Sequence, residues 1–233
     1  MKNSDEISKQ FSENLGVLTI KEFEVLRDVK ILLIGLGGLG GNIANGLVRL
    51  GVHHLTIVDF DCFDVTNLNR QLFSNSENLG EYKVNVIEKE LLKINSNSSI
   101  VSYTSKIQDI PQIKLGDFNY IIDAVDDLKT KVFIEKLGTD LNIPVLHGAC
   151  AGWYGQVGWI MPGSNLVKNI YGVHDHGIEA ELKNPSFTPS AVASIMVSEF
   201  LKMIKNSENT IINQFLLIDL YNNSMLKTGK KNQ

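Results

Sequence analysis

The stretch VKILLI at positions 29–34, followed directly by GLGGLGG at positions 35–41, decides the fold. The first run is apolar and rich in branched residues, which is typical of a buried strand. The glycines open a helix predicted over Leu39–Leu50, where apolar residues recur at helical spacing. A second strand, His54–Val58, ends at Asp59. Strand, glycine loop, helix and strand together indicate a βαβ unit of a parallel sheet.

The same alternation continues along the chain. Further helices are predicted at Tyr82–Ile94, at Lys129–Leu141, and from Thr188 as N-cap with Pro189 as first residue; strands are predicted at Ile100–Thr104, Tyr120–Ile122, Pro144–Leu146, Gly155–Met161 and Phe215–Leu220. Residues 162–187 show no convincing periodicity. We expect an α/β fold, a Rossmann-like, mostly parallel sheet with helices on both faces and an added antiparallel segment at Gly155–Met161.

Composition excludes several classes of protein. The 233 residues carry 22 basic and 26 acidic side chains, a net charge of −4, which does not predict nucleic-acid binding. The N-terminus lacks the pattern of a signal peptide, and the longest apolar stretches are strand-sized. Cys62 and Cys150 are too few for a disulfide framework or a four-cysteine zinc site. We expect a soluble cytoplasmic protein that binds neither nucleic acid nor a membrane.

The glycine loop has the context in which such a motif binds nucleotides. Gly35, Gly37 and Gly38 lie between a strand and a helix, where backbone N–H groups approach phosphate and the helix N-terminus favours negative charge. Asp59 closes the next strand, where a carboxylate accepts hydrogen bonds from ribose hydroxyls. The pattern indicates an adenine nucleotide and does not separate NAD, FAD and ATP. The alternative is a tight turn without a ligand.

Three charged residues favour ATP over a dinucleotide. Arg70 and Lys83 follow the ribose-binding strand, and Asp126 follows the strand at Tyr120–Ile122. An adenylating enzyme must neutralise a triphosphate while a carboxylate attacks it, whereas hydride transfer has no such need. Asp126 could hold Mg²⁺ with phosphate oxygens and waters. The alternatives are solvated surface charges and, for Asp126 with Asp127, an N-cap pair.

The chain contains, in order, the motifs GLGGLG, DFD, NLNRQ, G-x-x-K and DAVDD. With these motifs it resembles the ThiF/MoeB/HesA family of ubiquitin-activating-like adenylyltransferases over roughly residues 5–220. The resemblance implies ATP- and Mg²⁺-dependent adenylation of the C-terminal Gly-Gly carboxylate of a small ubiquitin-like sulfur carrier by a homodimer. It implies Arg70, Lys83 and Asp126 as catalytic residues, with Asp126 on Mg²⁺. It implies nucleotide contacts at Gly35, Gly37, Gly38, Asp59, Asp61, Thr66, Asn67, Asn69, Arg70, Gln71, Lys83, Asp126 and Asp127.

The sequence departs from many of its relatives in three ways. It lacks CxxC pairs, so no structural zinc is expected, and Asn184-Pro-Ser-Phe-Thr188 contains no cysteine for a covalent enzyme–carrier step. The position of an arginine that reaches the partner subunit matches Lys9, which keeps the charge without the bidentate fork. His174 and His176 could bind a metal, although no third ligand is evident. Cys150 is interpreted as a small buried residue.

The resulting hypothesis divides the chain into an N-terminal helical segment at 1–28, a ThiF-type ATP-binding adenylation domain at 29–220 and a polar tail at 221–233. The substrate is expected to be a ThiS- or MoaD-like sulfur carrier, with a peptide or a modified tRNA base as alternatives within the same enzyme class. An NAD-binding oxidoreductase and a non-catalytic carrier-binding scaffold are the other hypotheses. The pathway, thiamine or molybdopterin biosynthesis among them, is left open.

Overall fold

The central feature is a mixed sheet of eight strands. The computed structural model describes residues 9–111, 117–172 and 182–228. Within that part of the chain the strand order is β3-β2-β1-β4-β5-β6-β7-β8, and neighbouring strands are parallel from β3 to β5 and antiparallel from there on. The strands are β1 Lys30–Ile34, β2 His54–Val58, β3 Ser99–Tyr103, β4 Tyr120–Asp123, β5 Val145–Ala151, β6 Tyr154–Ile160, β7 Phe215–Asp219 and β8 Ser224–Thr228.

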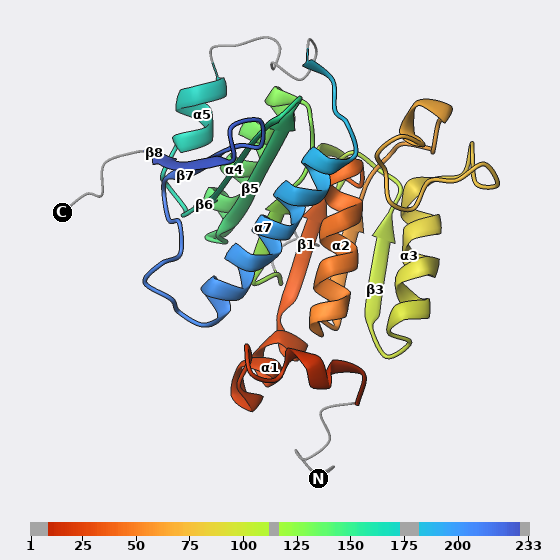
Figure 1. Cartoon of the computed structure of the whole chain (residues 1–233), viewed down its shortest axis with the longest axis horizontal. Coiled ribbons are helices and arrows are strands. Elements are labelled where there is room, and N and C mark those ends of the chain that lie inside the picture. Colours follow the sequence, from red (N-terminus) through yellow and green to blue (C-terminus); the bar gives the residue numbers. More distant parts are fainter. Residues whose placement is uncertain (1–8, 112–116, 173–181, 229–233) are drawn as a thin grey trace.

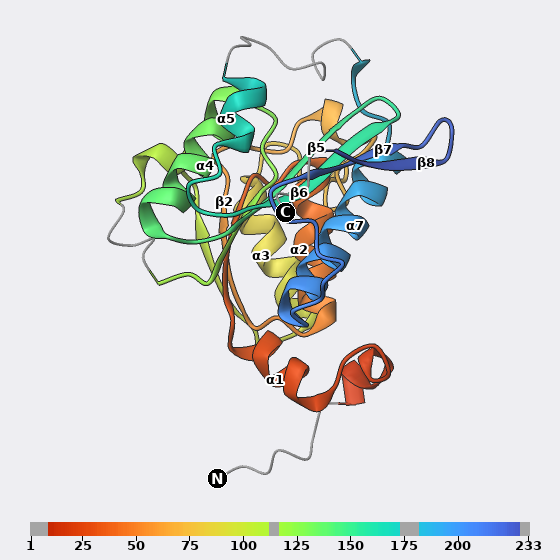
Figure 2. The same ribbon diagram turned by 90° about the vertical axis from the view of Figure 1, so that its left-hand side faces the viewer.

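Helices cover both faces of the sheet, as Figures 1 and 2 show. On one face α2 (Gly38–Leu50), α3 (Lys83–Ile94) and α7 (Phe187–Ile204) pack on the larger apolar core. On the other, α4 (Leu128–Leu141) and the short α5 (Leu166–Tyr171) enclose the smaller core. The N-terminal η1 (Lys9–Asn14) and α1 (Ile20–Asp28) lie beneath the sheet in Figure 1. Single 3₁₀ turns occupy Val65–Asn67 and Ile107–Asp109.

The predicted α/β class is confirmed, including the antiparallel orientation of β6. The strand predicted at Pro144–Leu146 is longer, because β5 continues through small residues to Ala151 and pairs with β6 along its whole length. The sequence predicts no strand beyond Phe215–Leu220, whereas β8 adds an exposed edge strand that pairs with β7. Residues 162–172 contain α5, which the aperiodic sequence does not predict. His174 and His176 lie outside the described residues.

The last helix differs from its prediction in two respects. It begins at Phe187, so Ser186 is the N-cap, and the Thr188 hydroxyl instead donates to the carbonyl of Gly152. By length and composition α7 is apolar enough to cross a membrane, although the sequence predicts only strand-sized apolar runs. In the structure α7 packs against α2, β5 and β6, with Val192, Met196 and Phe200 buried. A core helix satisfies the same criteria, so this one is weak evidence for a membrane span.

Candidate active site

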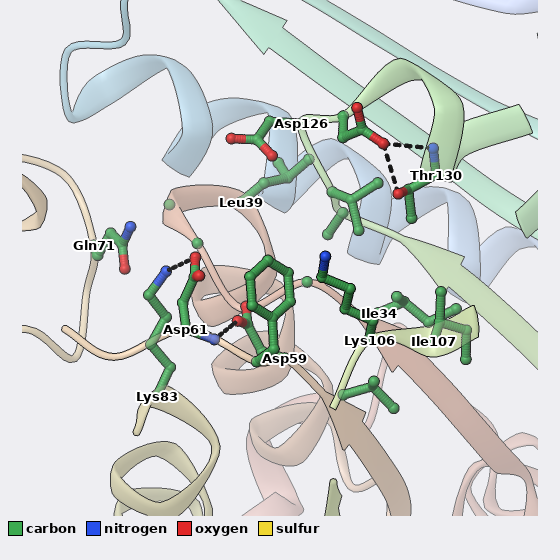
Figure 3. Close-up of a pocket in the computed structure, with 18 of the residues that line it drawn as sticks. Ile34, Leu39, Asp59, Asp61, Gln71, Lys83, Lys106, Ile107, Asp126 and Thr130 are labelled. Atoms are coloured by element: carbon green, nitrogen blue, oxygen red, sulfur yellow. Dashed lines mark hydrogen bonds and ion pairs between the residues drawn. The ribbon is translucent and has the colours of Figure 1, made fainter. Parts of the chain in front are cut away.

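A cavity of about 660 Å³ opens at the carboxyl ends of the parallel strands (Figure 3). Its walls come from the glycine loop after β1, the segments after β2 and β3, the turn between β4 and α4, the end of β5, and Asn184 ahead of α7. The strand order reverses between β1 and β4, and open α/β sheets bind ligands at such a switch point. Of the predicted site residues, the cavity is lined by Gly35, Gly37, Gly38, Asp59, Asp61, Asn67, Arg70, Gln71, Lys83, Asp126 and Asp127.

The glycine loop is shaped by close backbone contacts. Gly35 has a φ of +88°, and a Cβ there would lie 2.7 Å from the carbonyl oxygen of Ala124. A Cβ on Gly40 would lie 1.8 Å from the carbonyl oxygen of Gly35. At Gly37 the nearest atom is 3.8 Å away, in the side chain of Gln71. Gly35 and Gly40 therefore fold the loop, and Gly37 leaves the N-terminus of α2 open to the cavity. A Cβ on Gly38 would lie 3.3 Å from the ring of Pro189.

Gly40→Ala is expected to destabilise the protein, because its methyl group would meet backbone that cannot yield without opening the loop. Such overpacking costs about 1–3 kcal/mol or more in the free energy of unfolding. Gly37→Ala is the matched control, since its methyl group would make only an ordinary van der Waals contact, with Gln71 Nε2 at 3.8 Å, at a negative φ. Urea denaturation of both variants checks the prediction. Equal stabilities would show that the contact at Gly40 is not a packing constraint.

Asp59, Asp61 and Lys83 form one hydrogen-bonded group on the floor of the cavity (Figure 3). The buried Asp59 carboxylate accepts from the N–H of Leu36 at 2.6 Å and the N–H of Asp61 at 2.8 Å. Burial raises the pKa of Asp59, and Lys83 and these two N–H groups oppose that rise. The Lys83 ammonium is buried and donates to the Asp61 carboxylate at 2.9 Å. A buried cation is thus held in place beside the glycine loop.

Arg70 is fixed on a second wall by its own segment. Its Nη1 donates to the carbonyl of Thr66 at 2.8 Å and to Oδ1 of Asn69 at 2.9 Å. Thr66 and Asn69 do not line the cavity, so both act on it through Arg70. The neighbouring Gln71 is buried, and its Oε1 has no hydrogen-bond partner among the described residues. An unsatisfied acceptor on a cavity wall fits a polar ligand.

Asp126 and Asp127 have separate roles. Asp127 is the N-cap of α4, and its carboxylate accepts from the N–H and hydroxyl of Thr130 at 2.7 and 2.6 Å. The side-chain bond from Thr130 lowers the pKa of Asp127. The exposed Asp126 carboxylate lies at the cavity, with no hydrogen bond to any other described residue. The N-cap interpretation therefore holds for Asp127 and leaves Asp126 for a ligand.

The donor set fits Mg²⁺ bound together with phosphate. No cluster of three or more histidine, cysteine or acidic side chains that could hold a metal occurs in the described part of the chain. A single carboxylate facing a cavity lined by cations is a suitable ligand, because protein sites for Mg²⁺ usually combine one or two carboxylates with waters and substrate phosphates. Asp126 is that carboxylate, since Asp61 is already paired with Lys83.

Several residues that line the cavity belong to no sequence motif and are not predicted as site residues. Lys106, Ile107 and Gln108 reach the cavity from the segment after β3, and Gln108 donates to Thr130 at 3.1 Å. The Lys106 ammonium lies 5.2 Å from the centre of the Phe60 ring. These residues fall in no motif, so only the β2–β3 pairing indicates their position. Cys150, expected to be buried, is half-buried on the cavity wall.

A buried ionic cluster lies behind the Asp126 turn, formed by Asp123, Lys131 and His147. The side chains of Lys131 and Asp123 are 0% and 1% exposed, and the ammonium lies 3.5 Å from both carboxylate oxygens. Nδ1 of His147 lies 2.7 Å from Oδ2 of Asp123. Burial and Lys131 lower the pKa of His147, so its neutral ring donates from Nδ1 to the carboxylate. Burial raises the pKa of Asp123, but Lys131 and His147 outweigh it and the pKa is lowered.

The lowered pKa of His147 predicts a pH dependence of stability. Between the ordinary histidine pKa of about 6.5 and its lower folded value, only the unfolded chain binds this proton, so stability is lost as the pH falls through that range. The charges facing the ring are Asp123 and Lys131; the rings of Tyr171 and Phe215 pack on it. His147→Gln is expected to flatten the slope of unfolding free energy against pH below 6.5. Urea titrations from pH 7 to pH 4 measure it, and an unchanged slope would contradict this assignment.

The family profile described as ThiF family matches residues 11–233. The chain belongs to the ThiF family. It is 32% identical over 145 residues to the sulfur carrier protein ThiS adenylyltransferase of Bacillus subtilis, covering 60% of this chain and 42% of that protein. It is 37% identical over 140 residues to the NEDD8-activating enzyme E1 catalytic subunit of Schizosaccharomyces pombe, covering 57% and 31%.

The predicted resemblance to ThiF proteins is thus confirmed, although the chain spans less than half the length of these curated relatives. Among solved structures, Escherichia coli MccB with ATP superimposes with a TM-score of 0.79 at 20% identity, covering 95% of this chain and 71% of that one. A likeness at this identity shows the fold of the ThiF-family chain, a mixed sheet with antiparallel C-terminal strands.

Proposed function

We propose that this ThiF-family protein uses ATP to adenylate the C-terminal carboxylate of a ubiquitin-like sulfur-carrier protein that ends in Gly-Gly. The observation that carries the proposal is one cavity that joins a glycine loop at a helix N-terminus, the cations of Arg70 and Lys83, and the unpaired carboxylate of Asp126. Lys83 and Arg70 come from different segments, and membership of the ThiF family gives them a shared purpose. An NAD-binding oxidoreductase leaves that purpose unexplained.

The reaction needs positioning and charge stabilisation more than covalent participation by the protein. A carboxylate oxygen of the carrier attacks the α-phosphorus of ATP and forms an acyl–oxygen–phosphorus bond. The bond from that phosphorus to the bridging oxygen breaks, and pyrophosphate leaves with the electron pair. The first product is the carrier acyl-adenylate. No residue of the enzyme gains or loses a covalent bond.

Each residue of the site has a role in this step. N–H groups of the glycine loop face the phosphates, and Asp59 accepts from the ribose, because each carboxylate oxygen can accept a second hydrogen bond. Arg70 and Lys83 neutralise charge that develops on the phosphate oxygens. Asp126 would hold Mg²⁺, which when bound supplies further neutralisation of the triphosphate.

The proposal also covers the steps after adenylation and the assembly of the protein. The sequence has cysteines only at positions 62 and 150, so we propose adenylation without a covalent step through the loop before α7. We propose a homodimer in which Lys9, exposed on η1, approaches the partner's site. Structural zinc has no CxxC pairs to bind it.

The test is exchange of labelled pyrophosphate into ATP with candidate Gly-Gly-tailed carriers from the same genome. Exchange that requires both the intact tail and Mg²⁺ is expected, and carriers shortened by two residues serve as controls. If a short peptide supported exchange and none of the carriers did, the proposed carrier substrate would be wrong and a peptide substrate would be favoured. No exchange with any substrate, despite binding of Mg-ATP, would favour the scaffold hypothesis.

A further inference from the structure

The turn that carries Asp126 is held at both ends by hydrogen bonds that the proposed chemistry does not use. On the strand side, the N–H of Val125 donates to the Asp123 carboxylate at 3.2 Å. On the helix side, Asp127 caps α4, and the N–H of Lys131 donates to the carbonyl of Asp127 at 3.0 Å. Asp126 lies between these two anchors.

Lys131 joins the anchors. Its side chain extends back along α4 toward the N-terminus of the helix, as helical side chains do, and reaches the Asp123 carboxylate at the end of β4. Its ammonium also donates to the carbonyl of Gly148 at 2.8 Å. Gly148 lies on β5 directly before the cavity residues Ala149 and Cys150. One buried ammonium therefore connects β4, α4 and β5 behind the turn.

The charges in this cluster balance without Asp126. Asp123 is ionised, Lys131 is its counter-ion, and His147 donates from Nδ1 while its Nε2 has no partner among the described residues. Asp126 itself has no hydrogen bond to any residue that the structure describes. The position of the Asp126 carboxylate is thus set by its backbone, which the cluster fixes, and its charge is available to a cation.

We propose that Lys131 is a positioning residue for Asp126: by holding Asp123 and Gly148 together behind the turn, it sets the position of the carboxylate that binds Mg²⁺ with ATP. This inference rests on the proposed function, since it needs a Mg-ATP site at Asp126. Partners that orient a metal ligand from behind affect metal affinity or activity by about 10–100-fold when they are replaced. Lys131 would act at that level while touching neither nucleotide nor metal.

The test compares Lys131→Met with Lys131→Arg and with Lys136→Met. Lys136 lies on the same helix, is 70% exposed and pairs only with Asp140 among the described residues, so Lys136→Met is the matched control. Calorimetry measures the affinity for ATP with and without Mg²⁺. Pyrophosphate exchange gives kcat, KM for ATP and the Mg²⁺ concentration at half-maximal rate.

Lys131→Met is expected to raise the half-maximal Mg²⁺ concentration by about tenfold and to remove most of the gain in ATP affinity on adding Mg²⁺. Affinity for ATP without Mg²⁺ should change less than twofold. Lys131→Arg should restore part of the Mg²⁺ effect, and Lys136→Met should match the wild type. A Lys131→Met protein that loses thermal stability but keeps the wild-type Mg²⁺ dependence would overturn the proposal.

A second variant covers the case in which Lys131→Met does not fold, because it leaves the Asp123 charge buried without a partner. Asp123→Asn with Lys131→Met removes both charges and keeps an amide oxygen for the N–H of Val125. This folded double variant should show the same shift in Mg²⁺ dependence, and a wild-type dependence would again contradict the inference. If the wild type itself binds ATP no better with Mg²⁺, the proposed function fails, and not the role of Lys131 alone.

Discussion

Arg70→Ala will reduce the rate of the proposed carrier adenylation by about 10²–10³-fold, the loss seen when one donor to a developing charge is removed from an enclosed site. Arg70 lines the cavity, and Thr66 and Asn69 hold its Nη1, so the side chain is already ordered before substrate arrives. In the proposed step, the variant lacks a positive charge that would neutralise the phosphate oxygens as the α-phosphorus is attacked. The measurement is kcat for pyrophosphate exchange with the intact carrier, together with the affinity for ATP.

Two further variants make this result specific. Arg70→Lys keeps the charge without the planar fork, so it should recover only part of the lost rate. Arg49→Ala removes an arginine that bonds Asn45 on the outside of α2, away from the cavity, and should behave as wild type. Undiminished exchange in a folded Arg70→Ala protein would count decisively against adenylation at this site.

Asp126→Asn is expected to have the second large effect on the exchange rate. It removes the carboxylate charge proposed for Mg²⁺ and should lower kcat by about 10²-fold or more at a fixed Mg²⁺ concentration. The exposed side chain makes no hydrogen bond to another described residue, so the free energy of unfolding should stay within about 0.5 kcal/mol of wild type. Exchange rates over a Mg²⁺ titration and urea denaturation measure the two quantities.

Asp127→Asn is the matched control for that variant. Asparagine caps helices about as well as aspartate, so α4 should keep its start and the exchange rate should remain close to wild type. Asp127→Ala would instead lose about 0.5–2 kcal/mol of stability through the missing cap. If Asp127→Asn lost the Mg²⁺ dependence and Asp126→Asn kept it, the two roles assigned here would be reversed.

Local patterns predicted the elements that make the glycine loop, because a strand, its glycines and an amphipathic helix are all encoded within about twenty residues. They predicted less where small or exposed residues form a strand. β5 runs through Gly148, Ala149 and Cys150, which carry little strand signal, and is extended by pairing with β6. β8 is exposed at nearly every residue and is held mainly by backbone pairing with β7.

The candidate site divides in the same way. Arg70, Lys83 and Asp126 fall in motifs, and the fold brings all three to one cavity. Lys106 and Gln108 arrive from a segment without a motif, because β3 pairs beside β2. Lysine side chains are usually exposed, so the sequence gives no sign that Lys131 is buried. Only the packing of α4 on β4 and β5 shows it.

The order of strands in the sheet has a consequence for when the proposed ATP site is completed during synthesis of the chain. The cavity walls run from Ile34 to Asn184, and β1 lies between β2 and β4, two strands that both follow it in the chain. Until Asn184 has left the ribosome, no nascent chain has the whole cavity. A ligand that binds only the finished cavity stabilises that state by RT ln(1 + [L]/Kd) and leaves earlier states unaffected. Cellular ATP would then act on the last stage of folding, favouring the completed domain over partly folded intermediates.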